Sequence, residues 1–124
     1  MTKLFNLIIG GALGTVTRYY FSGLMYQLFG SSFPFGTFAV NMLGCFIIGL
    51  LASLSEDKFL LDTNARILLM VGFCGAFTTF STFIFETSNL IKEGESMQAF
   101  LNISASVIVG FLLFRLGVLA TKLI

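Results

Sequence analysis

The sequence predicts an all-α integral membrane protein with four transmembrane helices, the third of them broken near mid-membrane. Of 124 residues, 56% are hydrophobic and only 10% are charged, and the mean hydropathy of +0.96 is too high for an ordinary soluble domain. The apolar stretch Gly72 to Phe85, GFCGAFTTFSTFIF, contains two glycines, four hydroxyl side chains and five phenylalanines. Lipid offers no water to polar groups, so this stretch must face protein or a cavity, and it is a candidate functional segment.

Long uncharged runs set the number of spans, since crossing the hydrocarbon needs about 20 mostly apolar residues. The first run continues through Arg18 to Phe29, beyond the short apolar core of a signal peptide, so we expect a retained span. Pro34 and the polar residues before it divide the longest run into two. The expected spans lie near residues 4 to 29, 35 to 54, 66 to 91 and 97 to 121, and the short loops leave a single membrane domain, 1 to 124.

The charge and the residue types exclude several classes of function. A net charge of +1 without a basic patch argues against a nucleic-acid partner. Histidine is absent, and neither a carboxylate pair at membrane depth nor a nucleophile with a nearby base is recognisable, so an enzyme is not expected. Cys45 and Cys74 lack metal or redox spacing and are expected to be small packing residues.

The first, second and fourth spans each carry one face of small and polar residues, because positions three, four and seven apart share a helix face. These faces contain Gly11, Gly14, Arg18 and Ser22, then Thr37, Asn41 and Gly44, then Asn102, Ser106 and Gly110. The glycines are expected to be helix contacts, since small residues allow close approach. For Asn41 and Ser106, a helix contact and a polar pathway stay equally open.

Two charged residues lie near the interior of a span, Arg18 in the first and Glu86 in the third. A charge in lipid is costly, and such residues commonly mark an ion pathway. The alternative is that each reaches the interface with its charged end.

The third span is expected to break between Gly75 and Thr79. Glycine in a helix interior costs about 1 kcal/mol relative to alanine, and threonine somewhat less. The third span has the glycine pair Gly72 and Gly75, followed by the adjacent threonines Thr78 and Thr79. A break frees backbone carbonyls, which can coordinate a hard cation such as Na⁺.

Beyond the break, Thr79, Thr82, Phe83 and Glu86 share a helical stripe, and Phe80 adjoins it. Hydroxyls donate hydrogen bonds, and aromatic rings have a positive edge, so this arrangement favours a small hydrated anion without a fixed charge that would trap it. The alternative for the two phenylalanines is ordinary aromatic core packing.

The segment GFCGAFTTFSTF closely resembles the third-span signature of the Fluc (CrcB) fluoride channels. GGALGTVTRY, residues 10 to 19, and FGTFAVNMLGCFIIG, residues 35 to 49, resemble that family's first-span and second-span patterns. The resemblance implies a channel in the cell membrane, expected to be the bacterial inner membrane, that lets fluoride leave the cytoplasm passively. It also implies an antiparallel, dual-topology homodimer with two pores and a central structural Na⁺.

The resemblance also assigns residues. It implies that the backbone carbonyls of Gly75 and Thr78 bind Na⁺ together with those of the second copy, and that Phe80 and Phe83 line the pore, one ring coming from each subunit. The other residues that it places on or near the pathway are Asn41, Ser81, Thr82, Glu86 and Arg18. Thr37, Asn102 and Ser106 are included on helical spacing alone.

Two other functions stay open. A small four-span proton-coupled exporter would have a similar size, but such exporters depend on an acidic residue in the first span, and the first span here has none. A nonconducting subunit of a membrane assembly would explain the small faces but not the Phe, Thr and Ser residues of the third span.

Lysine and arginine are more frequent on the side that holds both termini and the central loop. That side carries Lys3, Lys58, Arg66, Arg115 and Lys122, against Lys92 on the other. Taken alone, this bias favours cytoplasmic termini, although Arg115 falls within the last span and three acidic residues crowd the central loop.

Overall fold

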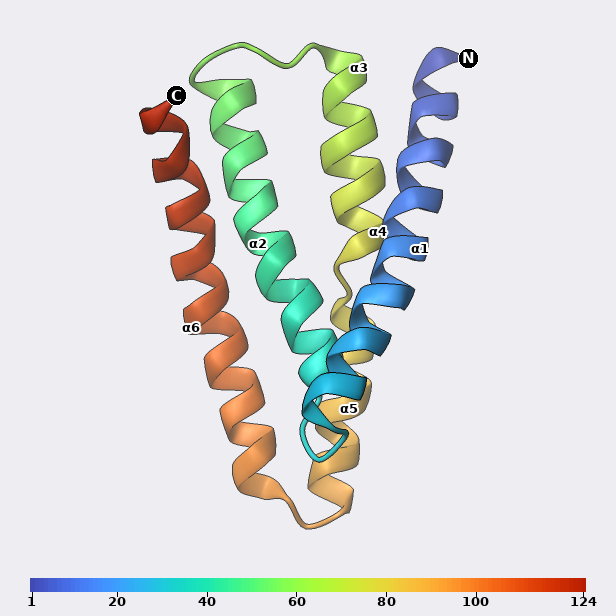
Figure 1. Cartoon of the computed structure of the whole chain (residues 1–124), viewed down its shortest axis with the longest axis vertical. Coiled ribbons are helices and arrows are strands. Elements are labelled where there is room, and N and C mark those ends of the chain that lie inside the picture. Colours follow the sequence, from blue (N-terminus) through green and yellow to red (C-terminus); the bar gives the residue numbers. More distant parts are fainter.

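A computed structural model describes all 124 residues, and every regular element in it is a helix. The helices form four rods, separated by connections after residues 29, 56 and 92. Figure 1 shows the rods and their short connections. Their elements, in chain order, are α1 (Thr2–Phe29), α2 (Phe35–Glu56), α3 (Thr63–Arg66), the π-helical η1 (Ile67–Cys74), α4 (Gly75–Phe77), α5 (Phe80–Lys92), α6 (Ser96–Ala120) and the 3-10 turn η2 (Thr121–Leu123). The elements α3, η1 and α4 follow one another directly and form the first half of the third rod, and α5 forms the second half.

Three helical segments are long and apolar enough to cross a membrane, judged by length and composition: Phe35–Glu56, Thr63–Lys92 and Ser96–Leu123. They match the second, third and fourth expected spans. Helix α1 has 28 residues and extends about 42 Å, which is long enough to span. It is not among the three segments, however, so the first span stays a prediction.

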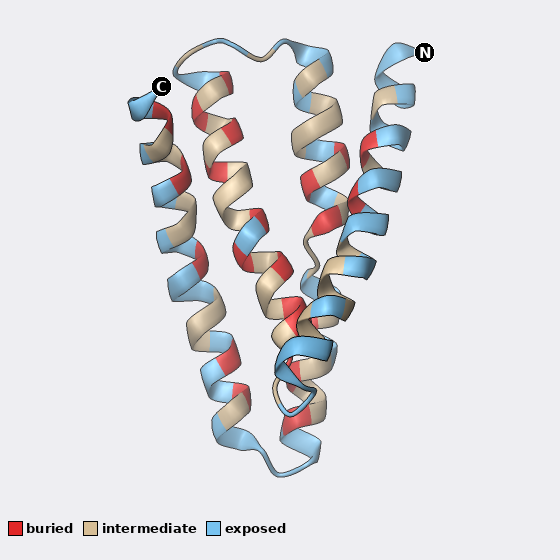
Figure 2. Cartoon of the chain, viewed as in Figure 1, coloured by how far each residue is buried: buried red, intermediate tan, exposed pale blue.

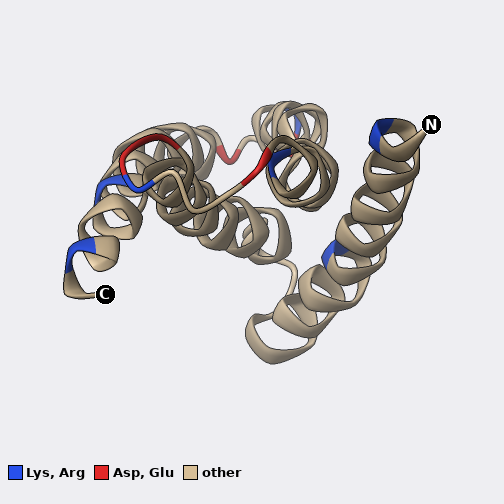
Figure 3. Cartoon of the chain, turned by 90° about the horizontal axis from the view of Figure 1, so that it is seen from above, with Lys and Arg blue, Asp and Glu red and all other residues tan.

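The rods run up and down, so both chain termini and the connection between α2 and α3 lie at one end of the molecule (Figure 1). Helix α6 packs along α2, whereas α1 packs mainly along η1 and α4 and crosses α2. Seen from above, the chain carries few charged residues (Figure 3). Among them, Arg18 of α1 and Glu86 of α5 lie within helices rather than in the connections.

Glycines allow two pairs of rods to approach backbone to backbone. A Cβ atom on Gly10 or Gly14 would overlap with carbonyl oxygens of η1, and one on Gly49 or Gly117 would overlap with carbonyl oxygens of the facing helix in the pair α2 and α6. Of the glycines on the small faces, Gly14, Gly44 and Gly110 make the expected helix contacts, since a Cβ on each would lie 3.3 Å or less from an atom of another helix. A Cβ on Gly11 would meet nothing within 4 Å, although its main-chain nitrogen lies 3.2 Å from the position of a Cβ on Gly72.

Most side chains face outward. Only 23 of 124 residues are buried, and many large apolar side chains are exposed along the rods (Figure 2). An apolar surface of this extent suits lipid or another protein chain rather than water.

At the end that carries the termini, buried hydroxyls join α2 to the end of α6. The hydroxyl oxygens of Ser53 and Thr121 lie 2.7 Å apart, and the Lys58 ammonium donates to the Thr121 carbonyl. The Ser53 hydroxyl oxygen lies within hydrogen-bond distance of an Asp57 carboxylate oxygen as well, at 2.8 Å. These bonds fix the far ends of the two helices to each other, away from the break in the third rod.

Candidate functional site

The third rod is broken at Thr78 and Thr79, inside the segment where the sequence predicts a break. Thr78 has φ −84° and ψ 160°, and Thr79 has φ −152° and ψ 118°, both extended. Gly75 is still helical, with φ −61° and ψ −33°. The prediction of a broken third helix is therefore confirmed, and the threonines form the break.

Asn41 of α2 binds both main-chain groups of Thr79. The Thr79 N–H donates to Asn41 Oδ1 at 2.8 Å, and Asn41 Nδ2 donates to the Thr79 carbonyl at 3.1 Å. An amide side chain offers a donor and an acceptor together, so it replaces the partners that a continuous helix would supply. At membrane depth no water is available to do so, and Asn41 therefore stabilises the break.

Threonine hydroxyls close the two helix ends at the break. Thr79 Oγ1 accepts the Thr82 N–H at 3.3 Å and donates to Thr82 Oγ1 at 3.0 Å, which caps the start of α5. On the other side, Thr78 Oγ1 donates to the Cys74 carbonyl at 2.9 Å. Two adjacent threonines thus end one helix and begin the next.

The break leaves two carbonyl oxygens available near its start. The Thr79 N–H, which would bind the Gly75 carbonyl in a continuous α-helix, binds Asn41 instead. The Thr78 carbonyl accepts only a long bond, 3.4 Å, from Nη1 of Arg18. Carbonyl oxygens suit a hard cation, but two are too few to coordinate one, so a complete site needs further oxygens.

A groove of about 370 Å³ runs along the break between α2 and the third rod. Its lining includes Asn41, Cys74, Gly75, Thr78, Thr79 and Phe80. Both candidate carbonyl residues therefore border a space that opens on the surface of the single chain.

A second, polar pocket of about 240 Å³ lies on the other side of the break, beside α1. It brings Arg18 of α1 together with Thr37 of α2 and with Thr79 and Thr82 of the third rod, and Thr15 and Ser22 also line it. One guanidinium and several hydroxyls thus surround a single space, which provides donors and a positive charge for an anion.

Phe80 and Phe83 are neighbours at the start of α5, with ring centroids 5.8 Å apart and planes 43° apart. Their environments differ, because Phe80 is 75% exposed and Phe83 only 8%. The neighbouring Phe77 belongs to the core, being 1% exposed and stacked on Phe73 at 5.6 Å. Within one chain, ordinary core packing therefore describes Phe77 and Phe83, but not Phe80.

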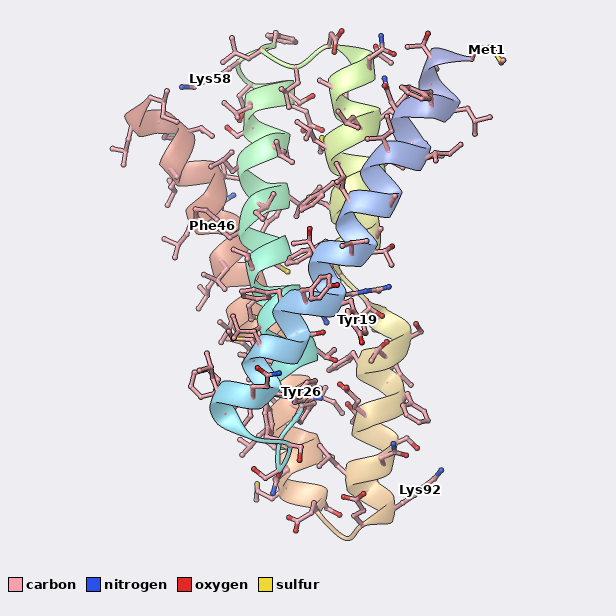
Figure 4. All side chains as sticks on the ribbon, turned by 45° about the vertical axis from the view of Figure 1, so that its right-hand side comes forward. Met1, Tyr19, Tyr26, Phe46, Lys58 and Lys92 are labelled. Atoms are coloured by element: carbon pink, nitrogen blue, oxygen red, sulfur yellow. The ribbon has the colours of Figure 1, made fainter.

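Glu86 lies farther along α5, where α1 ends. Its Oε1 accepts a 2.7 Å hydrogen bond from the Tyr26 hydroxyl, whereas Oε2 is buried without a partner. Both residues line a pocket of about 450 Å³ that also includes Glu93, Glu95 and other polar residues. In Figure 4, Tyr26 lies on the lower part of α1, toward the end of the molecule that holds Lys92 and away from Met1 and Lys58.

On α6, the two residues chosen by helical spacing behave differently. Asn102 is 1% exposed and donates to the Thr87 hydroxyl at 2.9 Å, so it makes a helix contact. The Ser106 hydroxyl is buried without a partner, one turn farther along the same face. Ser81, in contrast, is exposed and lies outside these pockets.

The family model for "CrcB-like protein, Camphor Resistance (CrcB)" matches residues 5–118 of the chain. The chain belongs to the CrcB family. The CrcB chain is thus a multi-pass protein of the cell membrane, in agreement with its three apolar, membrane-length helices.

Similar proteins carry an explicit functional name. The "Fluoride-specific ion channel FluC" of Maridesulfovibrio salexigens is 47% identical to this CrcB chain over 111 residues, which cover 90% of the chain and 88% of that relative. The protein of the same name from Solidesulfovibrio magneticus is 43% identical over 124 residues, 100% of the chain and 99% of the relative. A third, from a Geobacter species, is 41% identical over 122 residues, 98% of each.

The structure brings together most of the site residues that the sequence predicts, and it adds several. Asn41, Gly75, Thr78 and Phe80 share the groove, and Arg18, Thr37 and Thr82 share the polar pocket. The residues added by the structure are Thr15, Ser22, Tyr26 and Thr87. Tyr26 and Thr87 bond to residues of other helices, and Thr15 and Ser22 line the polar pocket. Sequence spacing relates positions on one helix, so it gave a signal only for Ser22, which lies on the first-span polar face.

Proposed function

We propose that this CrcB protein is a fluoride channel that lets fluoride leave the cytoplasm passively and so lowers fluoride toxicity. The observation that carries the proposal is the identity of 41 to 47% over nearly the whole chain to proteins named fluoride-specific ion channels. The break in the third rod and the polar pocket beside it support the proposal independently. They offer ion ligands at membrane depth.

The anion enters through the Arg18 pocket. Fluoride is small and strongly hydrated, so it crosses only where donors replace its water. The guanidinium of Arg18 and the hydroxyls of Thr37 and Thr82 supply such donors around a space of about 240 Å³, large enough for a partly hydrated ion.

From this pocket the ion passes the rings of Phe80 and Phe83, whose positive edges attract it without binding it permanently. Polar residues along the path replace the remaining water. They are Asn41, Ser81, Thr82, Glu86 and Ser106. Asn41 uses only one of its two amide hydrogens on Thr79, so the second is free for the ion. The Ser106 hydroxyl is buried without a partner and is available in the same way.

The protein works as a homodimer of antiparallel copies. The groove along the break opens outward, and Phe80 projects from the single chain with 75% of its surface exposed. A second copy packed there covers both features. The pores form between the subunits, and each receives phenylalanine rings from both.

A structural Na⁺ fits the carbonyls of Gly75 and Thr78. The donor chemistry suits it, because both are backbone oxygens and the Gly75 carbonyl lacks its helical donor. When bound, Na⁺ would supply a fixed positive charge that these carbonyl oxygens hold between two broken helices. One chain offers two such oxygens and a second copy doubles the number, so the cation and the dimer depend on each other. The measurement that checks this is ion density beside these carbonyls on the dimer axis, and a dimer without it contradicts the cation.

The decisive experiment uses purified protein in liposomes loaded with fluoride, with efflux followed by a fluoride electrode. We expect rapid fluoride efflux, very slow chloride efflux, and no need for a proton gradient or ATP. Efflux no faster than from empty liposomes would overturn the channel and favour a nonconducting subunit. Fluoride transport that stops when the proton gradient collapses would favour a coupled exporter.

Topology is tested separately, with a cysteine placed in the 56 to 66 loop on a background lacking Cys45 and Cys74. A membrane-impermeant reagent applied from either side of the cell membrane should modify part of the protein. Labelling from one side alone contradicts antiparallel copies, whatever the efflux experiment shows.

A further inference from the structure

The helix α5 is separated from the rest of the third rod by the break, so its position is not set by a continuous main-chain ladder. Main-chain hydrogen bonds end at Thr78, whose N–H binds Cys74, and the next N–H binds a side chain of α2. What holds α5 in place must therefore include contacts to other rods. Apart from the cap at its start, two side-chain hydrogen bonds reach it, one from Tyr26 to Glu86 and one from Asn102 to Thr87.

The bond between Asn102 and Thr87 is part of a buried relay. Asn102 Nδ2 donates to Thr87 Oγ1 at 2.9 Å, and Thr87 Oγ1 donates to the Phe83 carbonyl at 2.7 Å. Asn102 is 1% exposed and Thr87 5%. Because the Thr87 hydroxyl both accepts and donates, its orientation is fixed, and the relay runs from α6 to the backbone of Phe83.

The relay also sets which residues of α5 and α6 face each other. The two helices are antiparallel, joined by a short connection at the lower end of Figure 1. With Thr87 opposite Asn102, one helical turn toward the break places Phe83 level with Ser106. The Ser106 hydroxyl is buried there without a partner.

We propose that Asn102, acting through Thr87, is a positioning residue for fluoride conduction: it holds Phe83 in register with Ser106 across α5 and α6. This rests on the proposed channel function. A rotation of α5 by about 20° would move a ring about 5 Å from the helix axis by roughly 2 Å, which is comparable to the size of the ion itself. The relay prevents that rotation.

Matched variants distinguish positioning from general stabilisation. Thr87→Val removes the hydroxyl and keeps the shape, whereas Thr87→Ser keeps the hydroxyl. Asn102→Leu removes the other end of the relay. The control is Thr121→Val, because Thr121 is also fully buried and bonds both to another helix, through Ser53, and to a preceding carbonyl, but at the far end of the molecule.

In the liposome assay we expect Thr87→Val and Asn102→Leu each to lower fluoride efflux by about tenfold or more, since a misplacement of about 1 Å in positioned groups can cost about 100-fold in rate. Thr87→Ser should stay within about twofold of the unaltered protein, and the double variant should be no worse than either single one, because both act on one relay. Full efflux with Thr87→Val overturns the proposal. An equal loss with Thr121→Val also overturns it, by showing that any buried hydroxyl matters as much.

A second measurement does not depend on conduction. With 4-fluorophenylalanine in place of Phe83, the fluorine NMR resonance reports the surroundings of the ring in detergent. We expect Thr87→Val to shift or broaden it beyond its linewidth, and Thr121→Val to leave it unchanged. An unchanged resonance with Thr87→Val overturns the relay, whereas absent efflux in the unaltered protein overturns only the channel function.

Discussion

Replacing Asn41 by leucine should lower the free energy of unfolding, because Asn41 stabilises the break in the third rod. The change removes the bonds of 2.8 and 3.1 Å that satisfy the Thr79 N–H and carbonyl, while leaving a side chain of similar size. A buried polar group without a partner costs about 1 to 3 kcal/mol, which gives roughly 2 to 6 kcal/mol for two groups. Thr79 is only partly buried, so we expect the lower part of this range, about 2 to 3 kcal/mol.

The assay is equilibrium unfolding in mixed micelles of detergent and sodium dodecyl sulfate, followed by helix content. Asn102→Leu is the matched comparison, since it removes a single amide hydrogen bond and leaves the Thr87 hydroxyl with its bond to the Phe83 carbonyl. Its loss should be about half as large, near 1 kcal/mol. A loss below about 1 kcal/mol for Asn41→Leu would refute the reasoning, because Thr79 would then have found other partners.

Three further predictions concern other parts of the molecule. Gly49→Ala should lower the free energy of unfolding by about 1 to 3 kcal/mol in the same assay, because its Cβ would overlap with the Phe114 carbonyl of α6. Tyr26→Phe should cost about 1 to 3 kcal/mol, since it leaves the Glu86 carboxyl without its 2.7 Å hydrogen bond. Phe83→Ile should strongly reduce fluoride efflux from liposomes while the protein still folds and assembles, because an aliphatic chain lacks the positive ring edge.

Each of these has an internal control. Gly23→Ala adds a methyl group where nothing lies within 4 Å, so a loss equal to that of Gly49→Ala would rule out close packing as the cause. Tyr20→Phe removes an exposed hydroxyl that makes no bond, and equal losses for both tyrosines would contradict the role of Tyr26. For Phe83, the comparison is Phe85→Ile on an exposed part of the same helix, and undiminished efflux with Phe83→Ile would return that ring to ordinary packing.

The position of the break in the third rod could be predicted from local sequence. Two adjacent threonines after a glycine pair were enough to place it within five positions, Gly75 to Thr79, because helix propensity is a property of neighbouring residues. The stabilising partner was not foreseeable in the same way. Asn41 was recognised as a polar residue on a small face, but its two bonds to Thr79 join positions that lie far apart in the chain.

Asn102 and Ser106 share a helix face, but the sequence did not show which of them has a partner on another helix. Their spacing made both equal candidates for a pathway, yet Asn102 is bound to Thr87 whereas the Ser106 hydroxyl has no partner. The helical period decides which residues share a face. Which of them meets a donor on the next helix depends on the packing of the two rods.

By itself, the sequence determined that this is a helical membrane protein, where its apolar segments begin and end, and where the third of them breaks. These properties follow from composition, from runs of apolar residues and from local propensity, all of which act over a few neighbouring positions. Only the tertiary structure decided that Asn41 stabilises the break, that Arg18 shares a pocket with Thr37 and Thr82, and that Thr87 connects α6 to Phe83. Each of these is a contact between helices, so its geometry depends on how the helices pack rather than on any single segment.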